Sequence, residues 1–356
     1  MRWVESKEAI GKVDELLASV GLGHGSRKTL AGTWEDGERR GRRKSTIAAK
    51  VAIGGGKAAV VRAPGWDQYA WLQHGFSARA GGVSPIYDPD GAKGTLNLGW
   101  TKEDETANVA ENRRRFVRAV AGSKAGKLLT VRQFHSGLIR TVEAGDGALE
   151  GRLETPEGRA VLRGDGMMTD VPGVLLGVQV ADCVPVLVAD VKRKAVAAFH
   201  AGWRGTLRRI VERGIGTMRL RYGSRPEDLI AAIGPSIGAC CYSVGEEVRF
   251  EFESQFAYAP ELFSEVYDSD PVRDKYPLLF LTARAPGHSN IGPQIHLDLW
   301  EANRRQLLDA GLKAKRITVV GECSACARVG GRLKYFSHRG ESGFAGRMIG
   351  AVSIVR

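Results

Sequence analysis

The clearest hydrophobic pattern in the chain is a pair of apolar runs separated by a short basic stretch. Residues 184–190 and 195–200 are almost wholly apolar, and the four residues Val-Lys-Arg-Lys at 191–194 lie between them. Short apolar runs that flank a tight polar turn indicate the two buried strands of a β-hairpin. The similar run at 173–183 predicts a further strand that is buried on both faces.

Other segments predict helices and shorter strands. Helices are expected at 5–20, 104–122, 207–222, 245–256 and 296–311. In 207–222 the apolar residues follow steps of three and four, which is typical of an amphipathic helix, and they are Leu207, Ile210, Val211, Ile215, Met218 and Tyr222. Thr206 is the expected N-cap of this helix, because its hydroxyl can accept a hydrogen bond from the backbone. Further strands are expected at 69–84, 127–135, 229–234 and 316–321.

The order of these elements indicates the fold class. Strands and helices are mixed without a strict β-α-β alternation, which favours an α+β fold with layered mixed sheets over a doubly wound fold. Residues 1–65 are Gly-rich and basic, so we expect an N-terminal extension with one amphipathic helix. Residues 66–356 are expected to form a single domain.

Composition narrows the classes of protein. The chain has 356 residues, 43% of them hydrophobic, which is enough for a substantial core. No apolar run reaches the roughly 20 residues that span a bilayer, and the start lacks the apolar region of a signal peptide. We therefore expect a cytoplasmic protein that does not bind membranes. Five cysteines are an odd number in a chain of this size, which argues against a disulfide framework.

The formal charge of +12 could indicate nucleic acid, a phosphate-bearing small molecule or solubility alone. Much of it lies in clusters at 38–44 and 112–118, which we interpret as solvated surface. No aromatic residue interleaves the cluster at 38–44, so nucleic acid is not an expected partner.

The predicted hairpin brings a thiol and an imidazole together. With an even-numbered turn, Cys183 lies opposite Gly202 and His200 lies opposite Pro185. Opposite residues share a face, as do residues two apart on one strand. Cys183 and His200 are then diagonal neighbours about 7–8 Å apart at Cα. A turn with an odd number of residues would direct them to opposite faces.

Two chemistries remain open for this pair. Cys183 and His200 could form a thiolate–imidazolium nucleophile pair, as in cysteine hydrolases. They could instead be metal ligands together with His135, which ends its predicted strand beside small residues. One Cys and two His suit Zn²⁺ or copper, and three ligands leave a catalytic position open. An inert buried thiol with two core histidines is the purely structural alternative.

The segment 181–206, with "ADCVPVLVAD" and "AVAAFHAGWRGT", resembles the signature of the multicopper polyphenol oxidoreductase (laccase) family. Other matching segments follow in the family's order: "GFSARAGGVS" (75–84), "LNLGW" (96–100), "VAENRRR" (109–115), "VRQFHSG" (131–137), "GDGMMTDVPG" (164–173), "AIGPSIGACCYSVGEEV" (232–248), "LDLWEANRRQLLDAG" (297–311) and the tail from Cys323 to Arg347. The resemblance therefore covers roughly residue 68 to the C-terminus. Departures include Ser136 in place of a glycine and Ser324 in place of a threonine.

Members of this family are now regarded as purine nucleoside phosphorylases with adenosine deaminase side activity, and bacterial relatives include a peptidoglycan-editing factor. The resemblance implies a layered α-β-β-α sandwich and a single zinc ion held by His135, Cys183 and His200. It implies a purine nucleoside (adenosine, inosine or methylthioadenosine) and phosphate as partners, in a monomer or homodimer.

Four further residues are candidates for binding substrate or phosphate. Arg113 matches a family arginine that the resemblance places near the pocket, as a catalytic and phosphate-binding residue. Asn97 and Asp182 also match family positions, although backbone-shaping roles for these two stay open. Arg204 follows the His200 strand where a helix is expected to begin, so its guanidinium could help to bind an anion there. A surface salt bridge is the alternative for Arg204.

Three rival functions stay open: a copper-dependent polyphenol oxidase, a Cys–His hydrolase or amidase acting on peptidoglycan precursors, and a nucleic-acid binder. The remaining cysteines are interpreted as structural or buried. Cys323 and Cys326 have no second pair at the usual spacing of structural zinc sites. Cys240 and Cys241 are adjacent and are expected to point different ways, which argues against a joint ligand role.

Overall fold

The computed structural model describes residues 58–88, 94–122, 126–266 and 294–355. They belong to a compact unit that spans Thr46–Arg356. The helix expected at 5–20 lies outside the described residues. Residues 58–65, which the sequence analysis assigned to the extension, contribute strand β1 (Val60–Val61) and several buried side chains. They therefore belong to the packed unit, because β1 pairs with the next strand and buries its valines.

Two mixed sheets form the centre of the unit. The five-stranded sheet has the order β1, β2 (Leu72–Ser77), β17 (Met348–Ile354), β7 (Leu175–Val180) and β4 (Leu128–Thr130). The six-stranded sheet has the order β14 (Ile317–Val319), β10 (Leu229–Ile233), β8 (Val184–Asp190), β9 (Val196–Ala201), β6 (Gly166–Thr169) and β5 (Ile139–Val142). Each sheet combines parallel and antiparallel pairs. The predicted α+β fold with mixed sheets is confirmed.

The remaining elements are helices and small ribbons. The α-helices are α2 (Thr106–Ala121), α3 (Trp203–Leu207), α4 (Ile210–Tyr222), α5 (Glu246–Glu253) and α8 (Leu299–Asp309). The other strands are β3 (Ala80–Ser84), the three-stranded sheet of β11 (Ser243–Val244), β13 (Gln294–Leu297) and β12 (Phe263–Val266), and the pair β15 (Arg328–Val329) and β16 (Arg332–Leu333). No described helix has the length and apolar character needed to cross a membrane.

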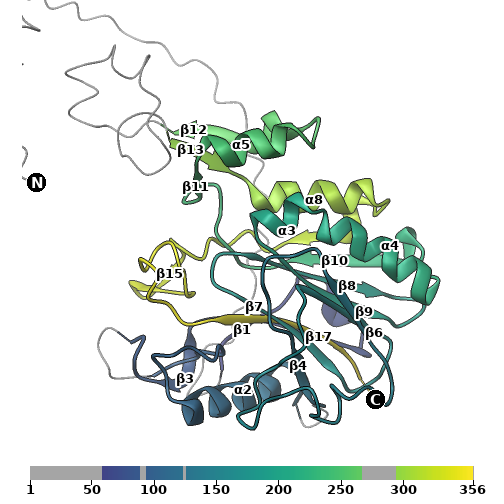
Figure 1. The fold of residues 1–356 in the computed structure, drawn as a ribbon, viewed down its shortest axis with the longest axis vertical. Helices are drawn as coiled ribbons and strands as arrows, with labels where there is room; N and C mark the ends of the chain where they lie inside the picture. The colour runs from purple at the N-terminus through teal and green to yellow at the C-terminus, as the bar shows by residue number, and fades with distance from the viewer. Residues whose placement is uncertain (1–57, 89–93, 123–125, 267–293, 356) are drawn as a thin grey trace, which may run out of the picture. The chain divides into compact units, whose positions relative to one another are not determined.

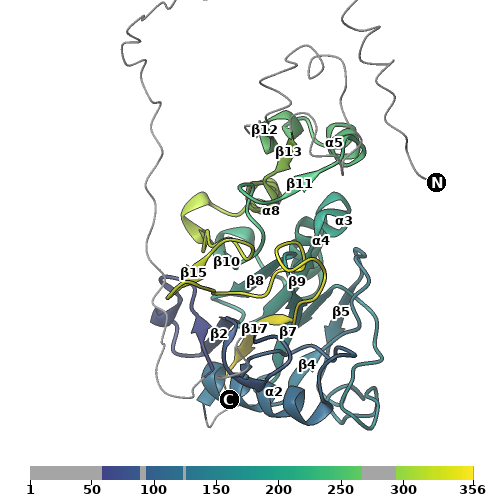
Figure 2. The same cartoon turned by 90° about the vertical axis from the view of Figure 1, so that its left-hand side faces the viewer.

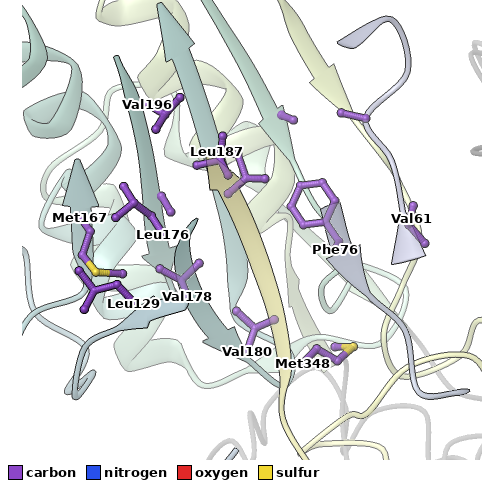
Figure 3. Close-up of a cluster of buried hydrophobic side chains, with 14 of the residues drawn as sticks. Val61, Phe76, Leu129, Met167, Leu176, Val178, Val180, Leu187, Val196 and Met348 are labelled. Atoms are coloured by element: carbon purple, nitrogen blue, oxygen red, sulfur yellow. The ribbon is translucent and has the colours of Figure 1, made fainter. Parts of the chain in front are cut away.

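Side-chain alternation along the strands creates three buried layers. On β8, Leu187 and Ala189 pack with residues of the five-stranded sheet, whereas Val186 and Val188 pack toward the helices. Figure 3 shows the cluster between the sheets, with Phe76 of β2, Leu176 of β7 and Leu187 of β8 side by side.

A second buried cluster joins the six-stranded sheet to α4 and α8, and a third joins α2 to the five-stranded sheet. Figure 1 accordingly shows α2 on one side of the strands and α3, α4 and α8 on the other. In Figure 2 as well, α5 and the three-stranded sheet lie beyond α8, on the side away from α2.

Several predicted boundaries are wrong. The helix expected at 207–222 is divided into α3 and α4, because Arg209 adopts a left-handed φ of 55° between them. Gly202 is the N-cap of α3, so Thr206 is not a cap; it is buried inside the helix. The strand expected at 127–135 ends at Thr130, and His135 lies in a loop. Residues 69–84 form two strands instead of one.

Candidate metal centre

The hairpin that carries two of the candidate ligands has the predicted register. Strand β8 pairs with β9 in antiparallel orientation, with Pro185 opposite His200 and Val184 opposite Ala201. Cys183 immediately precedes β8 and has the same parity as Pro185, Leu187 and Ala189. Cys183 and His200 therefore share the face that is directed at the five-stranded sheet.

His135 completes the group from a separate loop. Its left-handed φ of 60° turns the chain between β4 and β5, and its Nε2 lies 3.8 Å from Sγ of Cys183. The ring centroids of His135 and His200 are 5.0 Å apart. One ligand atom from each of His135, Cys183 and His200 lies within 4.8 Å of the others. We call these three residues the metal centre.

Asp165, which sequence analysis did not identify as a site residue, organises the metal centre. It is fully buried, and its carboxylate accepts a hydrogen bond of 2.9 Å from Nδ1 of His200. The same carboxylate accepts hydrogen bonds from the backbone N–H groups of His135 and Ser136 and from the Ser136 hydroxyl. One buried anion therefore fixes the ring of His200, directs its Nε2 toward Cys183 and shapes the His135 loop.

The charges at this site favour a thiolate. Burial alone would raise the pKa of Cys183, but the charge of His200 and hydrogen bonds from His135 and His200 outweigh burial and lower the pKa to about 6. Burial would lower the pKa of His200, yet the Cys183 thiolate and the Asp165 carboxylate together raise it to about 9. A thiolate is the form of cysteine that binds metals and acts as a nucleophile.

The donor set fits a single zinc ion. With Zn–S of about 2.3 Å and Zn–N of about 2.0–2.1 Å, two tetrahedral ligands of this kind lie about 3.6 Å apart, close to the 3.8 Å between Cys183 and His135. Gly202 makes room for the group, because a Cβ there would lie 2.7 Å from the Cys183 sulfur. Three protein ligands leave the fourth position free, which is the catalytic arrangement.

The metal centre faces a cavity of about 540 Å³, which is within the range of small-molecule sites. The lining residues are Val131, Arg132, Gln133, His135, Gln179, Val180, Ala181, Asp182, Cys183, His200, Gly202, Trp203, Ile237, Tyr242, Leu299, His338, Arg339 and Arg347. Arg132, Arg339 and Arg347 outnumber the single carboxylate, Asp182, so the lining is positive. These three arginines were not among the predicted binding residues, although all three lie in segments that carry the family resemblance.

Asp182 and Asn97 hold backbone segments around the cavity. The Asp182 carboxylate accepts hydrogen bonds from the Ser324 and Ser337 hydroxyls and from the Arg339 backbone N–H. Asn97 is fully buried and its Oδ1 accepts a hydrogen bond of 2.9 Å from the Arg347 backbone N–H. Asp182 lines the cavity and Asn97 does not.

Arg113 and Arg204 lie outside the cavity lining. Arg113 donates to the Leu98 carbonyl and its guanidinium lies 4.9 Å from the ring centroid of Trp100. Arg204 is exposed, with its guanidinium 4.2 Å from the ring centroid of Trp203. The predicted role of these two arginines in phosphate binding therefore stays a prediction.

Residues 73–355 match the family model described as multi-copper polyphenol oxidoreductase laccase. The purine nucleoside phosphorylase YlmD of Geobacillus stearothermophilus is 33% identical over 78% of this chain and 92% of the relative. A purine nucleoside phosphorylase of Deinococcus radiodurans is 32% identical over 80% of this chain and 90% of its own. Adenosine deaminase RL5, from an unknown prokaryotic organism, is 33% identical over 56% of this chain and 66% of its own.

Solved structures give the same picture of the fold. The crystal structure of YlmD from Geobacillus stearothermophilus is similar with a TM-score of 0.63 and 29% identity, covering 85% of this chain and 98% of YlmD. The hypothetical protein YfiH of Bacillus licheniformis is similar with a TM-score of 0.66 and 27% identity, over 85% of this chain and 98% of YfiH.

Proposed function

Because this chain belongs to the multi-copper polyphenol oxidoreductase laccase family, we propose that it is a zinc-dependent purine nucleoside phosphorylase, with adenosine deaminase as a side activity. The substrates are adenosine, inosine or methylthioadenosine together with phosphate. The names of the relatives support this class of reaction. The observation that carries the proposal is the metal centre at the wall of a cavity whose charged lining is mainly arginine.

The lining residues suit the two substrates. Arg132, Arg339 and Arg347 provide guanidinium groups that bind the phosphate oxygens, since planar forked donors match this anion well. Trp203 and Tyr242 are the tryptophan and tyrosine of the lining, and their rings provide flat surfaces for the purine. Aromatic and cationic groups in one cavity can therefore hold base and phosphate on either side of the ribose.

The reaction transfers the ribosyl group from the purine to phosphate. A phosphate oxygen forms a bond to C1′ as the bond between C1′ and the purine N9 breaks. The electron pair of the broken bond stays with the purine, which takes up a proton. The second product is ribose 1-phosphate, or 5-methylthioribose 1-phosphate when methylthioadenosine is the substrate. Holding both reactants in line is the main contribution of the arginines and the aromatic walls.

The role of the metal centre in this proposal is to place a positive charge beside the bound substrates. A zinc ion held by His135, Cys183 and His200 would supply a Lewis acid beside the cavity. Asp165 accepts the hydrogen bond from Nδ1 of His200, so that Nε2 is the nitrogen left to hold the metal. In the side reaction the amino group of adenosine is replaced by a water oxygen, giving inosine and ammonia.

The test is an assay of metal-quantified protein with each nucleoside, with and without phosphate. Phosphate-dependent release of free base and ribose 1-phosphate is expected, and Cys183→Ala should lose metal and turnover together. Arg132→Gln should raise KM for phosphate about tenfold with little change for the nucleoside, because one charge-assisted contact is lost. Arg193→Gln, which removes the same charge from the exposed far end of the hairpin, is the matched control and should change neither constant.

Other outcomes point to the rival chemistries. Full activity of metal-free Cys183→Ala protein would refute the metal mechanism. Turnover of an amide that chelators spare and alkylation of Cys183 abolishes would indicate a cysteine hydrolase. Bound copper with oxygen consumption on phenols would indicate an oxidase.

A further inference from the structure

Four of the five cysteines form a second group, separate from the metal centre. One sulfur from each of Cys240, Cys241, Cys323 and Cys326 lies within 4.8 Å of the other three. We call these four residues the thiol cluster. All four are free thiols, and none of them lines the cavity. The expectation that Cys240 and Cys241 point different ways is therefore wrong, because both sulfurs lie in this group.

Sheet topology explains why residues about 80 positions apart meet. Strands β10 and β14 are parallel neighbours, so the loops that follow them leave the same edge of the six-stranded sheet. Ser236, shortly after β10, forms a parallel bridge with Cys323, shortly after β14. The Ser324 N–H also donates to the Ser236 carbonyl at 2.9 Å. Backbone pairing thus fixes the two loops before the sulfurs interact.

The spacing of the sulfurs fits one ion. Four thiolates around one zinc at about 2.3 Å lie about 3.8 Å apart at tetrahedral angles, and the sulfurs of Cys240 and Cys326 are 3.7 Å apart. This separation is far longer than the roughly 2.05 Å of a disulfide bond. An iron–sulfur cluster places several irons and sulfides between its cysteines and needs a wider group.

The backbone around Cys323 supports a thiolate. Its sulfur accepts a hydrogen bond of 3.3 Å from the Gly238 N–H. Such a donor offsets negative charge on sulfur, as it does for carboxylates at helix ends. The Cys323 side chain is buried, so this donor is fixed by the fold rather than by solvent.

We propose that Cys240, Cys241, Cys323 and Cys326 bind a single tetrahedral zinc ion as a structural site. With four protein ligands this site is closed to substrate, in contrast to the metal centre. The ion would tie the loop that carries Ile237 and Tyr242 of the cavity wall to the segment of Ser324, whose hydroxyl donates to Asp182. Its role is to stabilise that wall.

The experiment uses the full chain with the metal centre removed by Cys183→Ser and His200→Ala. The protein is loaded with excess zinc in reducing buffer, desalted and measured for metal by mass spectrometry. One zinc per chain is expected, against two for the unmodified protein. Cobalt in place of zinc should give the intense visible bands and sulfur-to-metal charge transfer of a tetrahedral thiolate site.

Adding Cys323→Ser and Cys326→Ser should abolish the remaining zinc and the cobalt bands. If this variant does not fold, the comparison of the unmodified protein with the variant that lacks only the metal centre still tests the proposal. That comparison needs no change in the thiol cluster. Absence of zinc from the chain that lacks only the metal centre would overturn the proposal. A disulfide between any two of the four cysteines, found by peptide mapping of reduced and loaded protein, would overturn it as well.

Discussion

The metal centre and the thiol cluster both contain cysteine and lie at strand ends of the six-stranded sheet. They differ in how much space they leave for a substrate. The metal centre offers three candidate ligands, borders a cavity of about 540 Å³ and includes the exposed His135. The thiol cluster offers four candidate ligands and has no member in that cavity. The number of protein ligands, more than their chemistry, decides whether a bound ion can meet a substrate.

The two groups also differ in what supports them. In the metal centre a buried carboxylate, Asp165, orients His200 and the His135 loop. In the thiol cluster, the backbone N–H of Gly238 donates a hydrogen bond to the sulfur of Cys323. A buried carboxylate raises the basicity of a histidine ligand, whereas a backbone N–H donor offsets the negative charge of a thiolate.

The largest effect is expected for His200→Ala. This change removes one of three ligands, so the chain should lose one zinc and at least about 10³-fold in kcat/KM for phosphorolysis, since Lewis-acid stabilisation contributes several kcal/mol. Cys326→Ser should also remove one zinc, but it should lower the melting temperature and change kcat/KM less than tenfold. Metal analysis and steady-state kinetics on both variants measure the contrast. Equal losses of activity would show that the two groups do not divide the roles in this way.

The second-largest effect is expected in the rates at which Cys183, Cys240 and Cys241 react with an alkylating reagent after the metal has been removed. Burial raises the pKa of Cys241 to about 12 and also raises that of Cys240, whereas the pKa of Cys183 is lowered to about 6. At pH 7 the Cys183 thiol is then mostly ionised and the other two are almost wholly protonated. After allowing for the lower nucleophilicity of a low-pKa thiolate, Cys183 should react on the order of 10²-fold faster.

Iodoacetamide labelling of chelator-treated protein, followed by peptide mass spectrometry, measures these rates. The labelling rate of Cys183 should rise with pH and reach half its maximum near pH 6. Faster labelling of Cys240 than of Cys183 at pH 7 would contradict the charge distribution described for the metal centre.

An intermediate effect is expected for Asp165→Asn. The amide has one oxygen and two N–H donors, so it cannot accept all the hydrogen bonds that the carboxylate receives from His200, His135 and Ser136. Zinc affinity of the metal centre should fall about 10- to 100-fold, and the thiol cluster should keep its ion.

Asp190→Asn is the matched control for this change. Asp190 is also fully buried and accepts backbone hydrogen bonds from Lys192 and Arg193 in the hairpin turn. This variant should lose stability without losing zinc affinity. Titration with a fluorescent chelator separates the two effects, and an equal loss of affinity in both variants would mean that Asp165 acts only through folding.

The difference between the two groups also explains what the sequence could predict. The register of β8 and β9 followed from the even number of residues in the turn at 191–194, so the common face of Cys183 and His200 was predictable. The length of a turn is visible in the local sequence and sets the register of the two strands. The alternation of side chains then assigns every residue of both strands to a face. The mixed-sheet fold was likewise predictable from the lengths and order of the apolar runs.

Features that depend on pairing between distant segments were not predictable. Asp165 reaches His200 because β6 pairs with β9, and the thiol cluster forms because β14 joins β10 in parallel. Neither pairing has a local signal. A usable clue was present, since Cys240–Cys241 and Cys323–Cys326 each follow an apolar strand, but it becomes informative only once these strands are known to be neighbours. The break between α3 and α4 was missed because the left-handed Arg209 is not a glycine.

The smallest effects are expected at two glycines. Gly202→Ala has an allowed backbone at φ −68°, but its Cβ would lie 2.7 Å from the Cys183 sulfur and 3.2 Å from the His135 ring. The ligands must shift by a few tenths of an ångström, so zinc affinity of the metal centre should fall about tenfold and stability by about 1 kcal/mol.

Gly216→Ala, on the exposed side of α4 with no atom within 4 Å, should raise stability by about 0.5–1 kcal/mol and leave both zinc ions in place. Urea unfolding and zinc titration of the two variants would test this pair. Unchanged zinc affinity in Gly202→Ala would show that the ligands have more freedom than the packing of the metal centre around Gly202 implies.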